Sequence, residues 1–336
     1  MCPRMELSII VPSRNGHDRL PKTLEALADC FPPAGGFEVI VIDDGSMPPL
    51  AVPHGEPQRI CTTVVRLSPN RGRASACNAG LRAARGRVVL ILDDDMSLHS
   101  DALVKHVAAH PASAPPCAVV ARIVPGANAF HGRFGQFLKA EEERRRAKLL
   151  SSAVLSFEDC LTGHFSVPRE TLLRVGGYAE RFDRYGMEDL ELALRLKERG
   201  VPLTYRDDIV AAHRSAAVDF VTHCRRHLDS GRMARLFASV TADPAVAAFL
   251  RIDGMSVRSE HGCFRRTMAA THSFIRRLPR PLVGPTLGAA RLVVLMAQPL
   301  LPPRILHVGY HLVRDMHYAA GVAASCAGAG KPTETM

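Results

Sequence analysis

Five short, mainly apolar segments, separated by helix-like segments, constrain the fold of this chain more than any other feature. They are Leu7–Val11, Phe37–Ile42, Thr62–Leu67, Val88–Leu92 and Ala118–Val124. The spacing of Leu20, Leu24 and Leu27 predicts an amphipathic helix, and the Ala-rich run Gly72–Ala84 predicts a helix that lies close to a sheet. Apolar strands that alternate with helices form a parallel sheet with both faces covered. We therefore expect an α/β fold with a mostly parallel sheet flanked by helices.

The pattern changes after residue 125. The charged run Lys139–Lys148 predicts a helix, with Glu and Arg at the spacing of a solvated surface; a lid or acceptor-side element is the functional alternative. Helices near Pro168–Val175 and Glu188–Arg199 and then short strands follow. We expect a domain over 1–215 with halves 1–125 and 126–215, a helical extension over 216–326 and a disordered tail over 327–336.

Positive charge is concentrated in the C-terminal third. The net charge is +10, yet residues 1–213 hold 27 Lys and Arg against 26 Asp and Glu, whereas residues 214–336 hold 16 against 7. Such a region can attract nucleic acid, anionic lipid or an acidic substrate. The aromatic content is 5% with no Trp, and this third has no recognised nucleic-acid motif. We expect no nucleic-acid partner, and favour a membrane-surface or self-association role for residues 216–320.

The cysteines and the hydropathy of the chain indicate where in the cell the protein is expected. The nine cysteines are scattered, with none closer together than Cys61 and Cys77, and their odd number suits a reducing compartment better than a disulfide framework. The N-terminus has no signal-peptide pattern. The most apolar later stretch, Leu292–Leu301, has about half of the ~20 residues that a membrane-spanning helix needs. We expect a cytoplasmic protein, with peripheral association at the inner membrane face left open.

Polar clusters follow three of the predicted strands. They are Pro12–Asn15, Asp43–Ser46 and Asp93–Asp95. Ligands of parallel sheets bind outside the carboxyl ends of the strands, so the clusters converge if these strands are neighbours.

Each cluster has a functional and a structural interpretation. The three carboxylates of Asp93–Asp95 repel one another unless a divalent cation neutralises them; alternatively, they cap the predicted helix Asp101–Ala109. Asp43–Ser46 suits recognition of a nucleoside, or a simple β-turn. Asn70–Gly72 marks a helix start, and Arg71 and Arg73 lie near its positive end, which suits phosphate or base contacts or only a capped helix.

The motifs SIIVPSRN, VIDDGS, NRGRASACNAG and LILDDD, in this order, resemble family 2 of the inverting glycosyltransferases with the GT-A fold. The segment TGHFSVPRETLLRVGGYAERFDRYGMEDLELALRLKERG resembles the acceptor-side and catalytic segment of that family, and AAHR resembles its distal metal-binding histidine. The resemblance covers roughly residues 6–215. It implies that 1–125 binds a nucleotide sugar, most often UDP-linked, and that 126–215 binds the acceptor. It also implies a divalent cofactor, Mn²⁺ or Mg²⁺.

The resemblance also implies roles for individual residues. Asp95 and His213 would bind the metal, although an isolated histidine is usually structural. Asp189 would be the general base beside Glu188; their alternative role is to favour a helix N-terminus electrostatically. The donor nucleotide would contact Pro12, Arg14, Asn15, Asp43, Asp44, Arg71, Asn78, Asp93 and Asp94. The acceptor would lie against Gly163, His164 and Tyr178.

Two other classes of protein remain as alternatives. A nucleotidyltransferase also combines a nucleotide-binding sheet with metal-binding carboxylates, but residues 12–23 lack the Gly-rich phosphate loop that it needs. A nucleic-acid-binding protein would use the basic C-terminal third. The acceptor is not specified by the sequence and could be a glycan, a lipid carrier, a natural product or a peptide.

Overall fold

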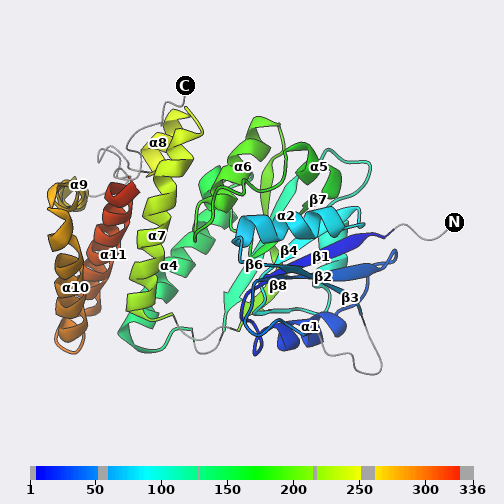
Figure 1. Ribbon diagram of the computed structural model, residues 1–336, viewed down its shortest axis with the longest axis horizontal. Helices are drawn as coiled ribbons and strands as arrows, with labels where there is room; N and C mark the ends of the chain where they lie inside the picture. The colour runs from blue at the N-terminus through cyan, green and yellow to red at the C-terminus, as the bar shows by residue number, and fades with distance from the viewer. Residues whose placement is uncertain (1–4, 52–59, 127–128, 215–217, 251–261, 326–336) are drawn as a thin grey trace. The chain divides into compact units, whose positions relative to one another are not determined.

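The computed structural model describes residues 5–51, 60–126, 129–214, 218–250 and 262–325 (Figure 1). The chain divides into two compact units, which we call the α/β unit and the helical unit. The α/β unit comprises 1–129, 141–183 and 188–216, and the helical unit comprises 130–140, 184–187 and 217–336. The tail expected over 327–336 lies outside the described residues. The two units are described separately below.

An eight-stranded sheet with the order β3-β2-β1-β4-β7-β6-β8-β5 forms the centre of the α/β unit. Its strands are β1 (Leu7–Ser13), β2 (Phe37–Asp44), β3 (Cys61–Leu67), β4 (Val88–Leu92), β5 (Met96–Leu98), β6 (Ala118–Pro125), β7 (His164–Pro168) and β8 (Leu203–His213). The four strands β3, β2, β1 and β4 are parallel, as is the pair β6 and β8. The short strands β5 and β7 are antiparallel to their neighbours. The expectation of a mostly parallel α/β sheet is confirmed.

The prediction of several short strands before residue 213 was wrong. Leu203–His213 is one strand of 11 residues, paired with β6 and interrupted only by a register shift at Ala121 and Arg122. The polar residues in the middle of β8 break the apolar pattern of the sequence. They do not break the strand, because backbone hydrogen bonds to β6 do not depend on the side chains.

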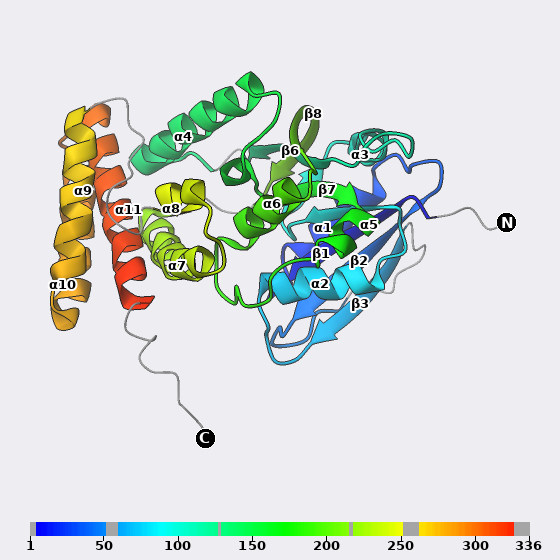
Figure 2. The ribbon, with the colours of Figure 1, turned by 90° about the horizontal axis from the view of Figure 1, so that it is seen from above.

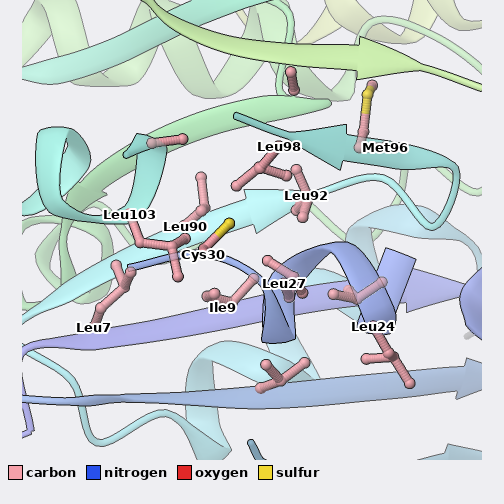
Figure 3. Close-up of a cluster of buried hydrophobic side chains, with 14 of the residues drawn as sticks. Leu7, Ile9, Leu24, Leu27, Cys30, Leu90, Leu92, Met96, Leu98 and Leu103 are labelled. Atoms are coloured by element: carbon pink, nitrogen blue, oxygen red, sulfur yellow. The ribbon is translucent and has the colours of Figure 1, made fainter. Parts of the chain in front are cut away.

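Helices cover the sheet and close its core. They are α1 (Leu20–Ala28), α2 (Arg73–Ala83), α3 (Ala102–Ala108), α5 (Arg169–Arg174) and α6 (Glu188–Glu198). The α/β unit also contains the 3₁₀ turn Phe157–Asp159 and part of α4 (Gly132–Ser151), which runs through both units. Leu24 and Leu27 of α1 pack with Leu90 and Leu92 of β4 (Figure 3). Helix α2 lies close to β1 because Gly80 has no side chain; a Cβ there would clash with Ile10 Cγ2.

Five helices form most of the helical unit: α7 (Phe220–Ser239), α8 (Pro244–Leu250), α9 (Gly262–Arg277), α10 (Arg280–Ala297) and α11 (Pro303–Ser325). α11 lies between α7 on one side and α9 and α10 on the other (Figures 1 and 2). α7 and α11 approach to backbone contact, since a Cβ on Gly231 would clash with the carbonyl oxygen of Tyr318. Among the described residues, no helix is long and apolar enough to cross a membrane. The prediction of a helical C-terminal region is confirmed.

Candidate active site

The three polar clusters meet at one edge of the sheet, as expected. Strands β2, β1 and β4 are parallel neighbours, and Ser13 at the end of β1 pairs with Asp43 at the end of β2. The Ser13 hydroxyl donates a hydrogen bond to Asp94 Oδ2, just beyond the end of β4, at 2.5 Å. The sheet therefore brings carboxylates from distant parts of the sequence together.

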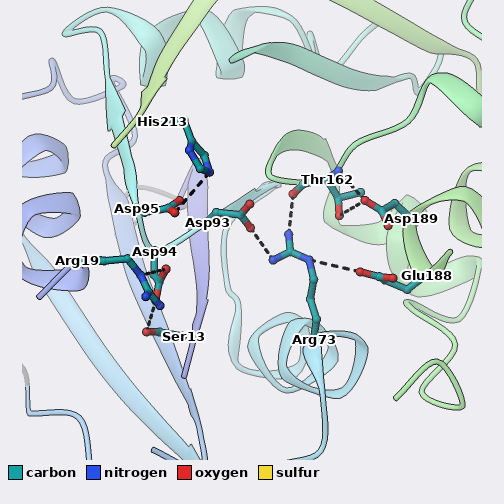
Figure 4. A network of polar contacts seen from close by, with 10 residues as sticks. All are labelled: Ser13, Arg19, Arg73, Asp93, Asp94, Asp95, Thr162, Glu188, Asp189 and His213. Carbon is teal, nitrogen blue, oxygen red and sulfur yellow. Dashed lines mark hydrogen bonds and ion pairs between the residues drawn. The ribbon is translucent and has the colours of Figure 1, made fainter. Parts of the chain in front are cut away.

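The three consecutive aspartates point in different directions (Figure 4). Asp93 faces Arg73 on α2, whose Nη1 donates to Asp93 Oδ1 at 2.5 Å. Asp95 faces His213 at the end of β8, with 3.4 Å between Asp95 Oδ2 and His213 Nε2. Helix-capping is excluded as the reason for the triplet, because β5 stands between it and α3. Asp93 and Asp95 therefore contact different parts of the α/β unit.

Asp94, predicted to contact the donor, has a structural role within the chain. Its side chain is buried, and both carboxylate oxygens accept hydrogen bonds from the chain itself. Arg19 donates from Nε to Oδ1 at 3.1 Å and from Nη2 to Oδ2 at 3.0 Å, and Oδ2 also accepts the Ser13 bond. The backbone oxygen of Asp94 accepts from the Thr23 hydroxyl at 2.8 Å. Asp94 therefore fastens the turn after β4 to the start of α1.

Asp95 and His213 form the part of the site that best suits a metal. Asp95 Oδ1 is buried and has no hydrogen-bond partner within the described part of the chain. Burial raises the pKa of Asp95, although His213 opposes the shift. A hard carboxylate oxygen beside an imidazole is a pair of ligands that fits Mn²⁺ or Mg²⁺. Within the described residues, no group of three or more His, Cys, Asp or Glu side chains is arranged to hold a metal ion.

Asp43 is buried and anchors the loop that follows β2. Its carboxylate accepts hydrogen bonds from the backbone N–H groups of Ser46, at 2.9 Å, and Leu50, at 3.1 Å, and pairs with Arg66. Burial alone would raise the pKa of Asp43, but the bonds from Ser46 and Leu50 and the charge of Arg66 lower it. Asp43 is therefore ionised, and its carboxylate holds the loop after β2 through contacts within the chain.

Asp44 organises the start of α2. Its two carboxylate oxygens accept from the backbone N–H groups of Arg71, at 2.7 Å, and Gly72, at 2.9 Å. Gly72 has φ +84°, in the left-handed region that glycine adopts without strain. The side chain of Arg71 is exposed at this helix start. Asp44 thus positions Arg71, which was predicted to contact the donor.

The loop after β1 is joined to the loop after β2. The N–H of Asn15 donates to Ser46 Oγ at 2.8 Å, and Met47 N–H donates to Asn15 Oδ1 at 3.0 Å. Asn15 has φ +51°, a left-handed conformation that Asn tolerates better than most residues. Arg14 is exposed and Pro12 is half-buried beside it. These predicted donor-side residues therefore lie together at the same edge of the sheet.

Arg73 connects the aspartate triplet to the acidic pair at the start of α6 (Figure 4). Besides Asp93, it donates from Nη2 to the Thr162 carbonyl oxygen at 3.1 Å, and its Nε lies 3.9 Å from Glu188 Oε1. The sequence predicts Arg73 near the positive end of a helix, suited to phosphate or base contacts, but does not predict its contacts with Asp93, Thr162 and Glu188. The motif NRGR contained the residue, but its partners lie 20 to 115 positions away in the chain.

Glu188 and Asp189 form a pair with raised pKa values. Burial raises the pKa of Glu188 to about 8, with repulsion from Asp189 adding to the shift. Burial also raises the pKa of Asp189, while Arg73 and the Thr162 N–H oppose the shift. Thr162 donates to Asp189 Oδ2 from its N–H at 3.2 Å and its hydroxyl at 3.4 Å. A carboxylate pair that holds a proton near neutral pH suits general acid–base chemistry.

Gly163 and Tyr178, predicted on the acceptor side, have clear packing roles. Gly163 accepts the N–H of Asp93 at 3.0 Å, and a Cβ on it would lie 2.5 Å from Asp93 Oδ2. Tyr178 is 2% exposed and exchanges two hydrogen bonds of 2.8 Å with the amide of Asn78. Asn78 also donates to Glu180 at 2.9 Å. The amide of Asn78, predicted to contact the donor, therefore joins α2 to the segment before α6.

His164 belongs to a buried hydrogen-bonded chain and has no exposed surface toward an acceptor. Its Nδ1 lies 3.2 Å from the Arg122 carbonyl oxygen, so Nδ1 carries the proton, and its Nε2 accepts from His106 Nε2 at 2.8 Å. His106 Nδ1 must then accept from Ser166, which in turn accepts from His110 Nε2, each at 2.8 Å. Burial lowers the pKa of His110 and of His164 to about 4. The whole chain is therefore neutral.

Comparison with known proteins decides the family. The model of glycosyl transferase family 2 matches residues 8–175, which is half of the chain, and a model described as the N-terminal domain of galactosyltransferase matches 150–215. This chain belongs to glycosyl transferase family 2. The family-2 segment contains the aspartate triplet and Arg73, and the second match contains Glu188, Asp189 and His213. Neither the nucleotidyltransferase nor the nucleic-acid alternative gains support from these matches.

Several proteins resemble this family-2 chain. An uncharacterized glycosyltransferase, YfnE, of Bacillus subtilis is 27% identical over 62% of this chain and 65% of its own length. A validoxylamine A glucosyltransferase of Streptomyces hygroscopicus subsp. limoneus is 28% identical over 59% of this chain and 49% of its own length. The chain therefore spans between about half and two thirds of these two relatives.

A solved structure supports the fold assignment. The mannosyltransferase PcManGT from Pyrobaculum calidifontis, in complex with GDP-Man and Mn²⁺, covers 93% of this chain and 86% of its own, with a TM-score of 0.59 and 19% identity. At this identity the similarity establishes the fold alone. The α/β unit of this family-2 chain accordingly has the GT-A fold.

Proposed function

We propose that this chain transfers a sugar from a nucleotide diphosphate sugar, UDP-linked by preference, to a hydroxyl group of an acceptor, with inversion at the anomeric carbon. One observation carries the proposal. In a chain of glycosyl transferase family 2, Arg73 bridges Asp93 of the triplet and Glu188 of the acidic pair, so donor-side and acceptor-side carboxylates share one site. The halves 1–125 and 126–215 would bind donor and acceptor respectively.

The donor side comprises the edge formed by β2, β1 and β4. Arg14, Asn15 and Arg71 would contact the nucleotide, with their loops held in place by Asp43 and Asp44. Asp95 and His213 would hold a divalent ion, which supplies positive charge to the departing diphosphate. The orphaned, buried Asp95 Oδ1 supports this assignment, because an unpartnered buried carboxylate oxygen costs free energy unless a cation compensates it.

The acceptor side centres on Asp189. Its carboxylate would take the proton from the acceptor hydroxyl as that oxygen forms a bond to the anomeric carbon. The bond from that carbon to the diphosphate oxygen breaks, and its electron pair leaves with the nucleoside diphosphate. Attack from the face opposite the leaving group inverts the configuration without a covalent enzyme intermediate. Glu188, with a pKa of about 8, would keep its proton at neutral pH and leave the negative charge on Asp189.

A donor screen tests the proposal. The full chain is incubated with UDP-, GDP- and dTDP-linked sugars in the presence of Mn²⁺ or Mg²⁺, and release of the nucleoside diphosphate is measured without an acceptor. We expect slow hydrolysis of one donor, dependent on the metal and lost in Asp95→Ala. Glu170→Ala serves as the control, because it removes a carboxylate that is 72% exposed on α5. Metal-independent hydrolysis, or equal rates in Asp95→Ala and the control, would contradict the proposal.

The cellular location proposed for the chain is the cytoplasm. The cysteines whose side chains the structure describes are free thiols, at Cys30, Cys61, Cys77, Cys117, Cys160 and Cys224. Free thiols in this number are typical of a reducing compartment. Nucleotide sugars would be the small-molecule partner.

A further inference from the structure

Helix α10 carries an apolar face that is exposed rather than packed. Leu282, Ala289, Val293 and Met296 are spaced by seven, four and three residues, which places them on one side of the helix, and all four are exposed. Val293 is 66% exposed and Met296 67%. Leu300, just beyond the helix, is 80% exposed. We call Leu282, Ala289, Val293, Met296 and Leu300 the apolar stripe.

The other side of α10 is already occupied. Leu287 packs with Met316 and Ala320 of α11, and Val294 packs with Tyr310 and Val313 of α11. α10 is therefore apolar on two sides, of which only one is covered within the helical unit. Figure 2 shows α10 and α9 lying alongside α11.

Exposed apolar side chains gather in this part of the described chain. Of the 18 large apolar side chains that are exposed among the described residues, nine lie between residues 274 and 308. They include Phe274 near the end of α9 and Ile305 near the start of α11. A concentration of this kind marks an interaction surface, whereas single exposed apolar residues need no explanation.

The charge of the same segment indicates what the surface binds. Residues 261–314 contain eight Arg and no Asp or Glu. Arg276, Arg277 and Arg280 are exposed at the corner between α9 and α10, and Arg304 is exposed at the start of α11. Arginines therefore flank the apolar stripe at both ends. A second copy of this chain would present the same cationic surface and repel the first, whereas an anionic surface would attract it.

We propose that the apolar stripe inserts into the surface of an anionic lipid bilayer, with α10 lying in the plane of the membrane. The apolar side chains would enter the boundary between headgroups and acyl chains, and the flanking arginines would bind lipid phosphates. An exposed apolar face bordered by Arg, in a helix that is unable to span the bilayer, is the pattern of an interfacial helix. This inference does not depend on the proposed transferase activity.

Vesicle flotation with the full chain tests the proposal. We use vesicles of phosphatidylcholine alone and of phosphatidylcholine with about one quarter phosphatidylglycerol. The chain is expected to float with the anionic vesicles, to bind the neutral ones far less, and to be released partly by high salt. Replacing Arg276, Arg277 and Arg280 together by Gln is expected to lower the partition coefficient about fivefold per arginine, roughly 100-fold in all.

A second variant tests the apolar contribution. Val293→Gln/Met296→Gln is expected to lower partitioning at least about tenfold, because each side chain loses its burial in the acyl region. The matched control is Phe31→Gln/Val154→Gln, which removes two apolar side chains, each 61% exposed, from the α/β unit and leaves partitioning unchanged. Leu300→Gln, at a position outside any helix, replaces the double variant if the latter unfolds.

Three outcomes would overturn the proposal. The first is no binding of the unmodified chain to anionic vesicles at low salt. The second is equal binding of the unmodified chain and the stripe variants. The third is a dimer in solution that Val293→Gln/Met296→Gln dissociates while vesicle binding is absent, which would assign the stripe to contact between two copies of the chain.

Discussion

Arg73 is expected to set the pH range in which the acidic pair works. Arg73→Gln removes a cation 3.9 Å from Glu188 Oε1 and 2.5 Å from Asp93 Oδ1. At 3.9 Å and an effective dielectric constant of about 20, one charge pair is worth ~4 kcal/mol, or a change of about three in pKa. The Arg73 side chain is 29% exposed, so solvent screening reduces the expected rise in the pKa of the Glu188–Asp189 pair to about one or two.

Arg73 opposes the upward pKa shift of Asp189, the proposed base, as it does that of Glu188, so its removal raises the pKa of the base as well. A carboxylate must be ionised to accept the acceptor proton, so a higher pKa moves the acidic limb of the pH profile of kcat/KM to higher pH. Nucleotide release below that limb is expected to fall about tenfold for each pH unit by which the limb moves, and to recover in alkaline buffer. Arg73→Lys keeps the positive charge and should move the limb much less.

The control for α2 is Arg82→Gln, which removes an arginine on the same helix whose side chain is 63% exposed. Its profile should match that of the unmodified chain. An equal loss of activity at every pH in Arg73→Gln, with the acidic limb unmoved, would refute the electrostatic role that we assign to Arg73.

Three further predictions concern the free energy of unfolding, measured by urea denaturation. The unfolded chain binds protons at His110 and His164 below about pH 6.5, whereas the folded chain does so only near pH 4. The free energy of unfolding should therefore fall by about 2 kcal/mol per histidine at pH 5, and a flat profile between pH 7.5 and 5 would contradict this. Ser166→Ala leaves two buried imidazole nitrogens without their partner and should cost about 2–5 kcal/mol in the same measurement, and a cost below about 0.5 kcal/mol would exclude the fixed hydrogen-bond order. Gly80→Ala should cost about 1–3 kcal/mol, because the added methyl group clashes with Ile10. The control is Gly288→Ala on α10, where a Cβ meets nothing within 4 Å; it should stabilise the chain by up to about 1 kcal/mol. Similar effects of the two substitutions would rule out the close approach of α2 to β1.

The sequence predicted those elements whose signal is local. Strands β1, β2 and β4 are mainly apolar runs, so their existence and the convergence of the polar residues after them followed from the pattern. α1 followed from its three leucines, and α2 from its small residues. The antiparallel insertion of β7 did not follow, because a buried strand has the same apolar composition whichever way it runs.

The roles within the site depended on contacts that no local pattern records. Asp94 was grouped with Asp93, but its hydrogen bonds to Ser13 and Arg19 turn it toward α1. The family resemblance predicts His164 on the acceptor side from its position in the motif, yet its ring points into a cluster with His106. Arg73 was missed as a bridge for the same reason, since its partners come from three separate elements.

The most direct test of the account is nucleotide release by Asp189→Asn at saturating donor and metal, with donor binding measured in the same preparation. We expect donor binding to be retained, because Asp189 is proposed for the acceptor side. We expect nucleotide release to fall by at least about 100-fold, because the attacking hydroxyl or water has no base to take its proton. Nucleotide release by Asp189→Asn at the rate of the unmodified chain, with the donor bound, would contradict the proposal that Asp189 is the base of this glycosyltransferase.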